Sequence, residues 1–112
     1  PNIDSLGHHY YMRNWRGLEP PRHLTLFNQY SLNKMLFATG FNAIQKKSGP
    51  RPLSPITKAS EAIRLGSSNN IDIHLSFQKR LIVRIGELWE AFFPRHREFL
   101  TLVASKNIED YK

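Results

Sequence analysis

The sequence predicts a mostly helical α/β domain that contains two β-strands. Apolar residues recur every three or four positions in residues 28–40, 55–65 and 72–93, as they do in amphipathic helices. Residues 41–48 alternate as a strand does, and residues 98–105 are apolar on both faces, as in a strand inside a sheet. A length of 112 residues suits one domain.

The composition is basic and lacks cysteine. The chain has 16 Lys and Arg against 9 Asp and Glu, a formal net charge of +7. This charge permits an anionic ligand, nucleic acid or an acidic partner and selects none of them. The lack of cysteine excludes a disulfide framework, a thiolate zinc site and a cysteine nucleophile, and it fits a reducing compartment such as the cytoplasm. The longest apolar run is far too short to span a bilayer, and we expect no membrane contact.

Residues 1–28 hold the densest group of side chains suited to binding or catalysis. This segment contains three of the five histidines, two adjacent tyrosines, a tryptophan and three arginines. Gly7, Gly17 and the Pro20–Pro21 pair interrupt any long helix, so we expect a loop with one short helical turn. Loops of this kind, held on a scaffold, are where binding and catalytic residues usually lie.

The helix expected over residues 28–40 has a recognisable beginning and end. The side chain of Asn28 can accept a hydrogen bond from a free backbone N–H of the first turn. Gly40 suits the left-handed position that follows the last turn. Phe41 then begins the strand predicted over residues 41–48.

The next helix should lie over residues 55–65 and end at Gly66. We expect Ser54 to be its N-cap, and Pro55 suits the first helical position because its fixed φ angle is already helical. This helix and the longer one after it form a pair between the two predicted strands.

The longest helix should run over residues 72–93 and end at Pro94. Its apolar residues recur at helical spacing over more than four turns. We interpret the aromatic residues Trp89, Phe92 and Phe93 as core residues rather than as a ligand site, because aromatics at this spacing usually fill cores.

The last strand, over residues 98–105, lacks enough partners in this chain. A strand that is apolar on both faces belongs inside a sheet, yet only residues 41–48 are available to pair with it. A two-stranded sheet is marginal by itself, and an open edge invites another strand. We therefore expect one edge to lack a partner, and residues 106–112 to form a frayed tail. The chain opens on Pro1-Asn2 without a starting methionine, which suggests a point inside a longer protein.

Several short motifs resemble those of one protein family. They are Pro1-Asn2, Trp15, Pro21-Arg22-His23, Phe27 and Ala38-Thr39-Gly40-Phe41. In this order they resemble the segment after the fifth strand of class I S-adenosylmethionine-dependent methyltransferases, in a broad bacterial group that acts on small molecules.

The resemblance implies the carboxyl-terminal portion of a Rossmann-like sheet. In this family the seventh strand lies between the fifth and the sixth, and the last two strands form an antiparallel pair. Residues 41–48 would be the sixth strand and residues 98–105 the seventh, so residues 1–112 would be a fragment of one methyltransferase domain. Residues 55–93 would be an inserted helical pair, because many relatives have a shorter connection there.

The same resemblance implies S-adenosylmethionine as the methyl donor but leaves its main binding motifs outside the chain. All glycines here are isolated, so no glycine-rich loop is present, and we predict no turnover by this chain alone. Of the residues that bind the methyl donor in this family, only the one matched by Asn2 would lie in this chain. We expect no metal site.

Residues 2–23 would lie on the acceptor side of the donor. His23 is the candidate catalytic residue, because a histidine near neutral pKa can remove a proton from an acceptor. A structural role, in which His23 braces the loop, is equally open, and Trp15 suits packing better than ligand stacking. The candidate acceptor-binding residues are His8, His9, Tyr10, Tyr11, Trp15, Arg16 and Arg22.

The partners expected are a small-molecule acceptor, the missing amino-terminal half of the domain, and a second copy of the chain. The second copy would bind through residues 98–105 or through the long helix. An alternative function is a basic module that binds nucleic acid or a partner protein through basic and aromatic side chains. We favour the methyltransferase and do not expect nucleic acid as a partner.

Overall fold

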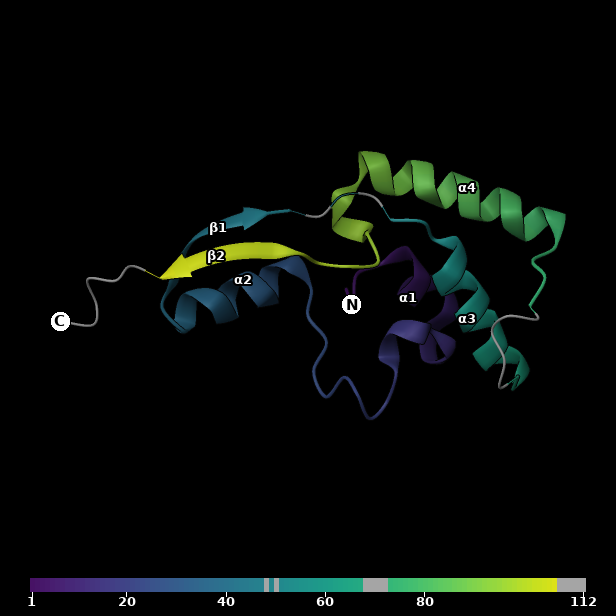
Figure 1. Cartoon of the computed structure of the whole chain (residues 1–112), viewed down its shortest axis with the longest axis horizontal. Helices are drawn as coiled ribbons and strands as arrows, with labels where there is room; N and C mark the ends of the chain where they lie inside the picture. The colour runs from purple at the N-terminus through teal and green to yellow at the C-terminus, as the bar shows by residue number, and fades with distance from the viewer. Residues whose placement is uncertain (48, 50, 68–72, 107–112) are drawn as a thin grey trace.

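The computed structural model describes residues 1–47, 49, 51–67 and 73–106 (Figure 1). Its helices are α1 (Leu6–Tyr11), α2 (Gln29–Ala38), α3 (Ser54–Leu65) and α4 (Phe77–Phe92), and its strands are β1 (Phe41–Lys46) and β2 (Leu102–Lys106). Short 3₁₀ turns lie at Met12–Asn14, Arg16–Leu18 and Pro94–His96. The prediction of a mostly helical α/β chain is therefore confirmed, whereas a Rossmann-like sheet stays a prediction.

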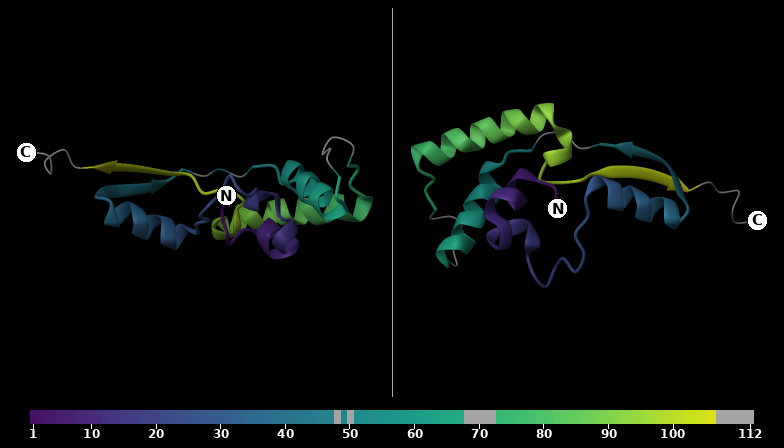
Figure 2. Two further views of the ribbon diagram at one scale, coloured as in Figure 1. Left: turned by 90° about the horizontal axis from the view of Figure 1, so that it is seen from below. Right: turned by 180° about the vertical axis from the view of Figure 1, so that it is seen from behind.

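β1 and β2 form an antiparallel two-stranded sheet. Phe41 pairs with Lys106 and Lys46 with Leu102, with an irregularity in register between these ends. α2 lies along this sheet (Figures 1 and 2). Among the described residues β2 pairs with no strand other than β1. The prediction that one edge of the last strand lacks a partner is confirmed to that extent.

The last strand is shorter and less buried than the sequence suggested. It begins at Leu102 rather than at Glu98, and Val103 is 47% exposed, so the prediction of a strand over residues 98–105 that is enclosed on both faces is wrong. The amino-terminal segment holds the preceding residues away from the sheet. The backbone N–H of Asn2 donates to the Glu98 carbonyl at 2.9 Å, and that of Gly7 donates to Oε1 of Glu98 at 2.6 Å.

The two helices that flank β1 differ in how well their starts were predicted. Asn28 caps α2 as expected, since its Oδ1 accepts from the backbone N–H of Ser31 at 2.9 Å. The glycine after α2 adopts the left-handed conformation, with φ +83°. α3 already includes Ser54, so this residue is not the predicted N-cap. α3 begins one residue earlier than predicted because Leu53, the residue before it, is buried and its N–H donates to Oε1 of Glu87 at 3.1 Å.

α4 begins later than predicted and turns its apolar side outward. Its first residue is Phe77, and the predicted start at residue 72 lies outside the described residues. Trp89 is 47% exposed, Phe92 78% and Phe93 47%, so their interpretation as core residues is wrong. The physical reason is that α4 packs against the rest of the molecule mainly through Val83, Gly86 and Glu90, on another side of the helix.

The molecule is extended and its apolar core is small. The main buried cluster consists of Leu53, Leu75 and Val83, with Ile73 packed against it. The sheet and α2 lie towards one end, and α1, α3 and α4 lie towards the other (Figure 2). The radius of gyration is 16.6 Å, whereas a compact domain of this length would have about 13 Å. Within the described part of the chain, no helix has the length and apolar character needed to cross a bilayer.

Candidate functional site

The amino-terminal loop folds around one buried carboxylate, that of Glu98. This side chain is 3% exposed, and it accepts hydrogen bonds from the Gly7 N–H at 2.6 Å and from Nε1 of Trp15 at 2.8 Å. Ser5, whose side chain caps α1, also hydrogen bonds to Glu98. A Cβ added to Gly7 would collide with the carboxylate, so glycine is required at this close approach.

A second carboxyl group, that of Glu90, lies near the first. Glu90 is 2% exposed, and its Oε1 has no hydrogen-bond partner among the described residues. Burial, and then the charge of Glu98, raise the pKa of Glu90 to about 7. Burial also raises the pKa of Glu98, although the hydrogen bonds from Trp15 and Gly7 oppose this. The site therefore contains a buried carboxyl group that titrates near neutral pH.

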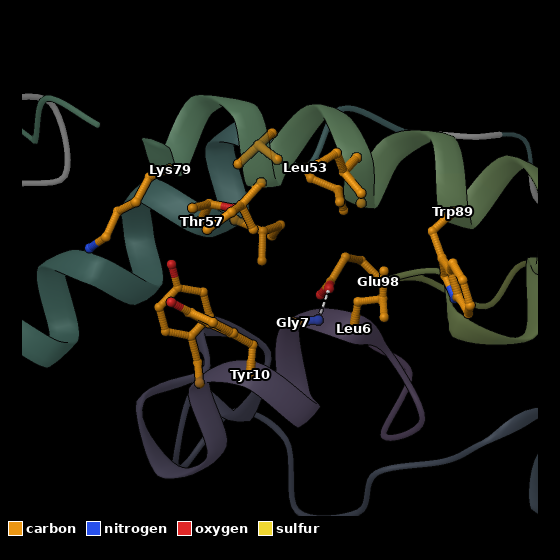
Figure 3. Close-up of a pocket in the computed structure, with 14 residues that line it drawn as sticks. Leu6, Gly7, Tyr10, Leu53, Thr57, Lys79, Trp89 and Glu98 are labelled. Carbon is orange, nitrogen blue, oxygen red and sulfur yellow. Dashed lines mark hydrogen bonds between the residues drawn. The ribbon is translucent and has the colours of Figure 1, made fainter. Parts of the chain in front are cut away.

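The larger of the two main cavities beside Glu98 lies between α1, α3 and α4, with a volume of about 290 Å³. Its walls are formed by Leu6, Gly7, Tyr10, Tyr11, Leu53, Ile56, Thr57, Lys79, Ile82, Val83, Ile85, Gly86, Trp89 and Glu98. Figure 3 shows Glu98 and Leu6 at one side of this space, with Tyr10 and Lys79 towards the other end. The cavity suits a ligand with an apolar body, because most of its walls are aliphatic or aromatic.

The smaller cavity has a volume of about 160 Å³ and brings together three of the predicted site residues. Its walls are formed by Pro1, Trp15, Arg16, Gly17, Glu19, His23, Ile56, Glu98 and Phe99. Glu98 and Ile56 line both cavities, so they form the wall between them. The candidate residues Trp15, Arg16 and His23 thus meet beside the buried carboxylate.

Glu19 organises the charges of the smaller cavity. Its carboxylate lies 2.6 Å from Nη2 of Arg16, 3.3 Å from Nη1 of Arg22 and 3.7 Å from Nε2 of His23. The hydrogen bond from Arg16 is the main cause that lowers the pKa of Glu19. A carboxylate beside an imidazole can orient the ring, which suits either an acid–base role or a bracing role for His23.

The two predicted tyrosines lie at the larger cavity. The hydroxyl of Tyr11 donates to Glu61 at 3.0 Å, and Glu61 also binds Arg64 at 2.7 Å and Lys79 at 2.6 Å. Burial and this hydrogen bond raise the pKa of Tyr11. Although burial opposes it, the hydrogen bonds from Lys79 and Arg64 lower the pKa of Glu61. Tyr10 is 62% exposed and packs edge-on against Tyr11, so it can contact a ligand at the rim.

The two predicted histidines of α1 lie outside both cavity walls. Nδ1 of His8 lies 2.7 Å from the carbonyl oxygen of Ile3, and its ring packs 5.1 Å from that of Trp15. His9 is exposed. Their positions fit support of the loop better than contact with a ligand in either cavity.

The side chain of Asn2 connects the start of the chain to the segment after α4 through hydrogen bonds. It is fully buried, and its side-chain amide donates to the carbonyls of Arg95 at 2.8 Å and Arg97 at 2.7 Å. Its Oδ1 accepts from the backbone N–H of Asp4 at 3.1 Å. These contacts use both amide hydrogens of Asn2, and its complete burial keeps the side chain out of reach of a methyl donor in this structure. The described residues do not fit a donor site, so we derive no step through S-adenosylmethionine.

Sequence reasoning assigned no role to the acidic residues that organise the site. Helical spacing places Glu61 away from the predicted apolar side of Ala59 and Ala62, so its burial could not be read from the pattern. Glu90 and Glu98 carried no local pattern either.

No group of three or more His, Asp or Glu side chains in the described part of the chain is placed to hold a metal ion. Comparison with protein-family models, with curated proteins and with solved structures finds no match for this chain. Its function therefore has to be argued from the arrangement of its own residues.

Proposed function

We propose that this chain is the acceptor-side, carboxyl-terminal portion of a class I S-adenosylmethionine-dependent methyltransferase that acts on a small molecule. The order of three segments carries the proposal. Asn2 hydrogen bonds to Glu98, just before β2, and β2 pairs antiparallel with β1. The segment that ends in β2 thus lies between the start of the chain and β1. This is the order of the fifth, seventh and sixth strands in the family that the sequence resembles.

The position of the loop supports the same proposal. In open α/β sheets, ligands bind beyond the carboxyl ends of the parallel strands. If Pro1-Asn2 ends such a strand, residues 3–27 leave from the ligand-binding edge. Both cavities adjoin Glu98, which hydrogen bonds to that same point.

The chain's own residues would bind and orient the acceptor. Methyl transfer needs alignment of the acceptor atom and the exclusion of water, and some acceptors must also lose a proton. The larger cavity would hold an apolar part of the acceptor. His23, oriented by Glu19, is the proposed proton acceptor, and Arg16 would hold an anionic group.

The donor-binding half of the domain would come from upstream sequence. Its last strand would run antiparallel along the free edge of β2, continuing the hydrogen bond that Asn2 makes with Glu98. The chain alone would then be inactive. We propose the cytoplasm as its location.

Ligand-induced stabilisation tests the proposal. S-adenosylhomocysteine, the demethylated donor, should raise the melting temperature of a longer polypeptide that carries the complete domain. The stabilisation should reach about 2.7 kcal/mol at a hundredfold excess over the dissociation constant. The 112-residue chain should show no shift. Absence of a shift in the longer polypeptide at millimolar ligand would count against the proposal. Steeply salt-dependent binding of single-stranded nucleic acid would instead favour the basic module.

A further inference from the structure

One broad side of α4 is apolar and faces away from the molecule. In an α-helix, residues three and four positions apart lie on one face. The residues on this side that lie outside the walls of both cavities are Phe77, Leu81, Leu88 and Phe92, with exposed fractions from 53% for Leu81 to 82% for Phe77. Ile82, Ile85 and Trp89 lie beside them but also line the larger cavity. We call the four residues Phe77, Leu81, Leu88 and Phe92 the apolar face of α4.

The burial of α4 is the reverse of that of an ordinary surface helix. Its buried residues are Val83 and Glu90, and a Cβ at Gly86 would press against Leu53. The helix therefore contacts the body through Val83, Gly86 and Glu90 and leaves the apolar face outside. Ile82, Ile85 and Trp89 lie between the two sides and line the larger cavity. A contiguous apolar surface of this kind marks a place of interaction, whereas single exposed apolar residues are normal.

The exposed charges beside the apolar face are all positive. Arg80 and Arg84 are exposed on α4, and Arg95 follows in the next turn with 75% of its side chain exposed. Glu87 accepts from the Leu53 N–H at 3.1 Å through Oε1 and pairs with Nη1 of Arg84 at 3.4 Å through Oε2, and Arg95 pairs with Asp4 at 3.6 Å. Glu90 is buried. Three arginines against these two carboxylates leave the charge beside the apolar face positive on balance, which fits an apolar and negatively charged partner.

We propose that α4 docks on the surface of an anionic lipid bilayer. The apolar face would lie at the boundary between headgroups and acyl chains, and the guanidinium groups of Arg80 and Arg84 would reach the lipid phosphates. Aromatic and leucine side chains beside arginines are the composition of helices that lie in this interface. The earlier expectation of no membrane contact rested on the lack of a spanning segment, which an interfacial helix does not need.

Charge argues against a second copy as the occupant. Each chain carries a formal net charge of +7, so two copies repel each other at low salt. An anionic bilayer has the opposite charge.

The position of α4 argues against the missing half of the proposed domain. That half would continue the sheet from the free edge of β2, which faces away from β1. Figure 1 shows α4 on the β1 side of the molecule. The apolar face is therefore available for a planar surface while the sheet is extended on its other side.

Vesicle co-sedimentation tests the proposal with the 112-residue chain. We expect binding to vesicles of phosphatidylcholine mixed with phosphatidylglycerol, weak binding to phosphatidylcholine alone, and loss of binding at high salt. The double variant Arg80→Gln/Arg84→Gln should bind the mixed vesicles about thirtyfold more weakly. Leu81→Ser/Leu88→Ser should weaken binding at least about tenfold. Lys34→Gln/Lys46→Gln loses the same charge away from α4 and should bind within about threefold of the unchanged chain.

Results that differ from these expectations contradict the proposal. Circular dichroism and urea midpoints show whether a variant is folded, and the arginine variant changes surface residues alone, so it remains informative if the leucine variant unfolds. No binding to mixed vesicles, or equal binding to both kinds, contradicts an anionic lipid surface. A dimer in light scattering that the leucine variant dissolves would make a second copy the occupant. Binding that disappears in a longer polypeptide with the complete domain would make the upstream half the occupant.

Discussion

Replacing Glu90 by glutamine should make the stability of the protein less dependent on pH. The Glu90 side chain is 2% exposed, and its Oε1 lacks a hydrogen-bond partner among the described residues. Its ordinary pKa of 4.5 is raised to about 7, mainly by burial and then by the charge of Glu98. Glutamine has nearly the same shape and carries no charge at any pH in this range.

The direction and the size of this pH effect follow from the number of protons that the folded and unfolded states bind. Between pH 4.5 and about 7 the folded protein retains the proton on Glu90, whereas the unfolded chain releases it. Because the folded state binds more protons there, the free energy of unfolding falls as pH rises. At about 1.4 kcal/mol per pH unit, this window amounts to roughly 3 kcal/mol. Above a pH of about 7, Glu90 is ionised in both states, so its ionisation causes no further loss of stability.

Urea unfolding at pH 5 and pH 8 measures the effect. The unchanged protein should lose stability between these values, and Glu90→Gln should lose less and should be the more stable of the two at pH 8. Some dependence should remain, because burial also raises the pKa of Glu98. Glu87→Gln is the control for loss of a charge from the same helix, and its amide oxygen can still accept from Leu53. It also loses the ion pair with Arg84 and a small contribution to the raised pKa of Glu90, so it should change the pH dependence only slightly. If Glu90→Gln and the unchanged protein lost equal stability, the argument from burial would be wrong.

Three further substitutions test the site. Gly7→Ala should destabilise the protein by about 1–3 kcal/mol, because its Cβ would displace the Glu98 carboxylate from Trp15; an unchanged melting temperature would contradict this. Tyr11→Phe should cost about 0.5–1.5 kcal/mol in urea unfolding because the hydrogen bond to Glu61 is lost, whereas Tyr10→Phe, at an exposed position, should cost almost nothing. In a polypeptide with the complete domain, His23→Gln should lower the methyl transfer rate about 10²–10⁴-fold; unchanged rates with reduced stability would assign His23 to bracing.

The cavities and the charged cluster around Glu19 could be predicted in part. The sequence indicated that Trp15, Arg16 and His23 belong to one functional loop, and the structure brings all three to one cavity wall. It could not indicate that His8 and His9 lie outside that wall, because residues adjacent in sequence on a short helix point in different directions. Nor could it indicate Glu19, which itself adopts the left-handed conformation at the end of a 3₁₀ turn.

The sequence by itself determined the existence and order of the helices and strands. The cap at Asn28, the left-handed glycine after α2 and the apolar periodicity of α4 depend on residues within a few positions of one another. Hydrogen bonds and side-chain contacts at that range form in any environment that keeps the helix, so the local pattern was sufficient to predict them.

The tertiary structure alone decided which side of α4 is buried and where the carboxylates meet. Trp15 and Glu98 are far apart in sequence, yet they share a buried hydrogen bond. Periodicity shows that a helix has an apolar side, but it cannot show which side the rest of the chain covers. That choice depends on the surfaces offered by α1 and α3, and in this protein they cover the side of Val83 and Glu90.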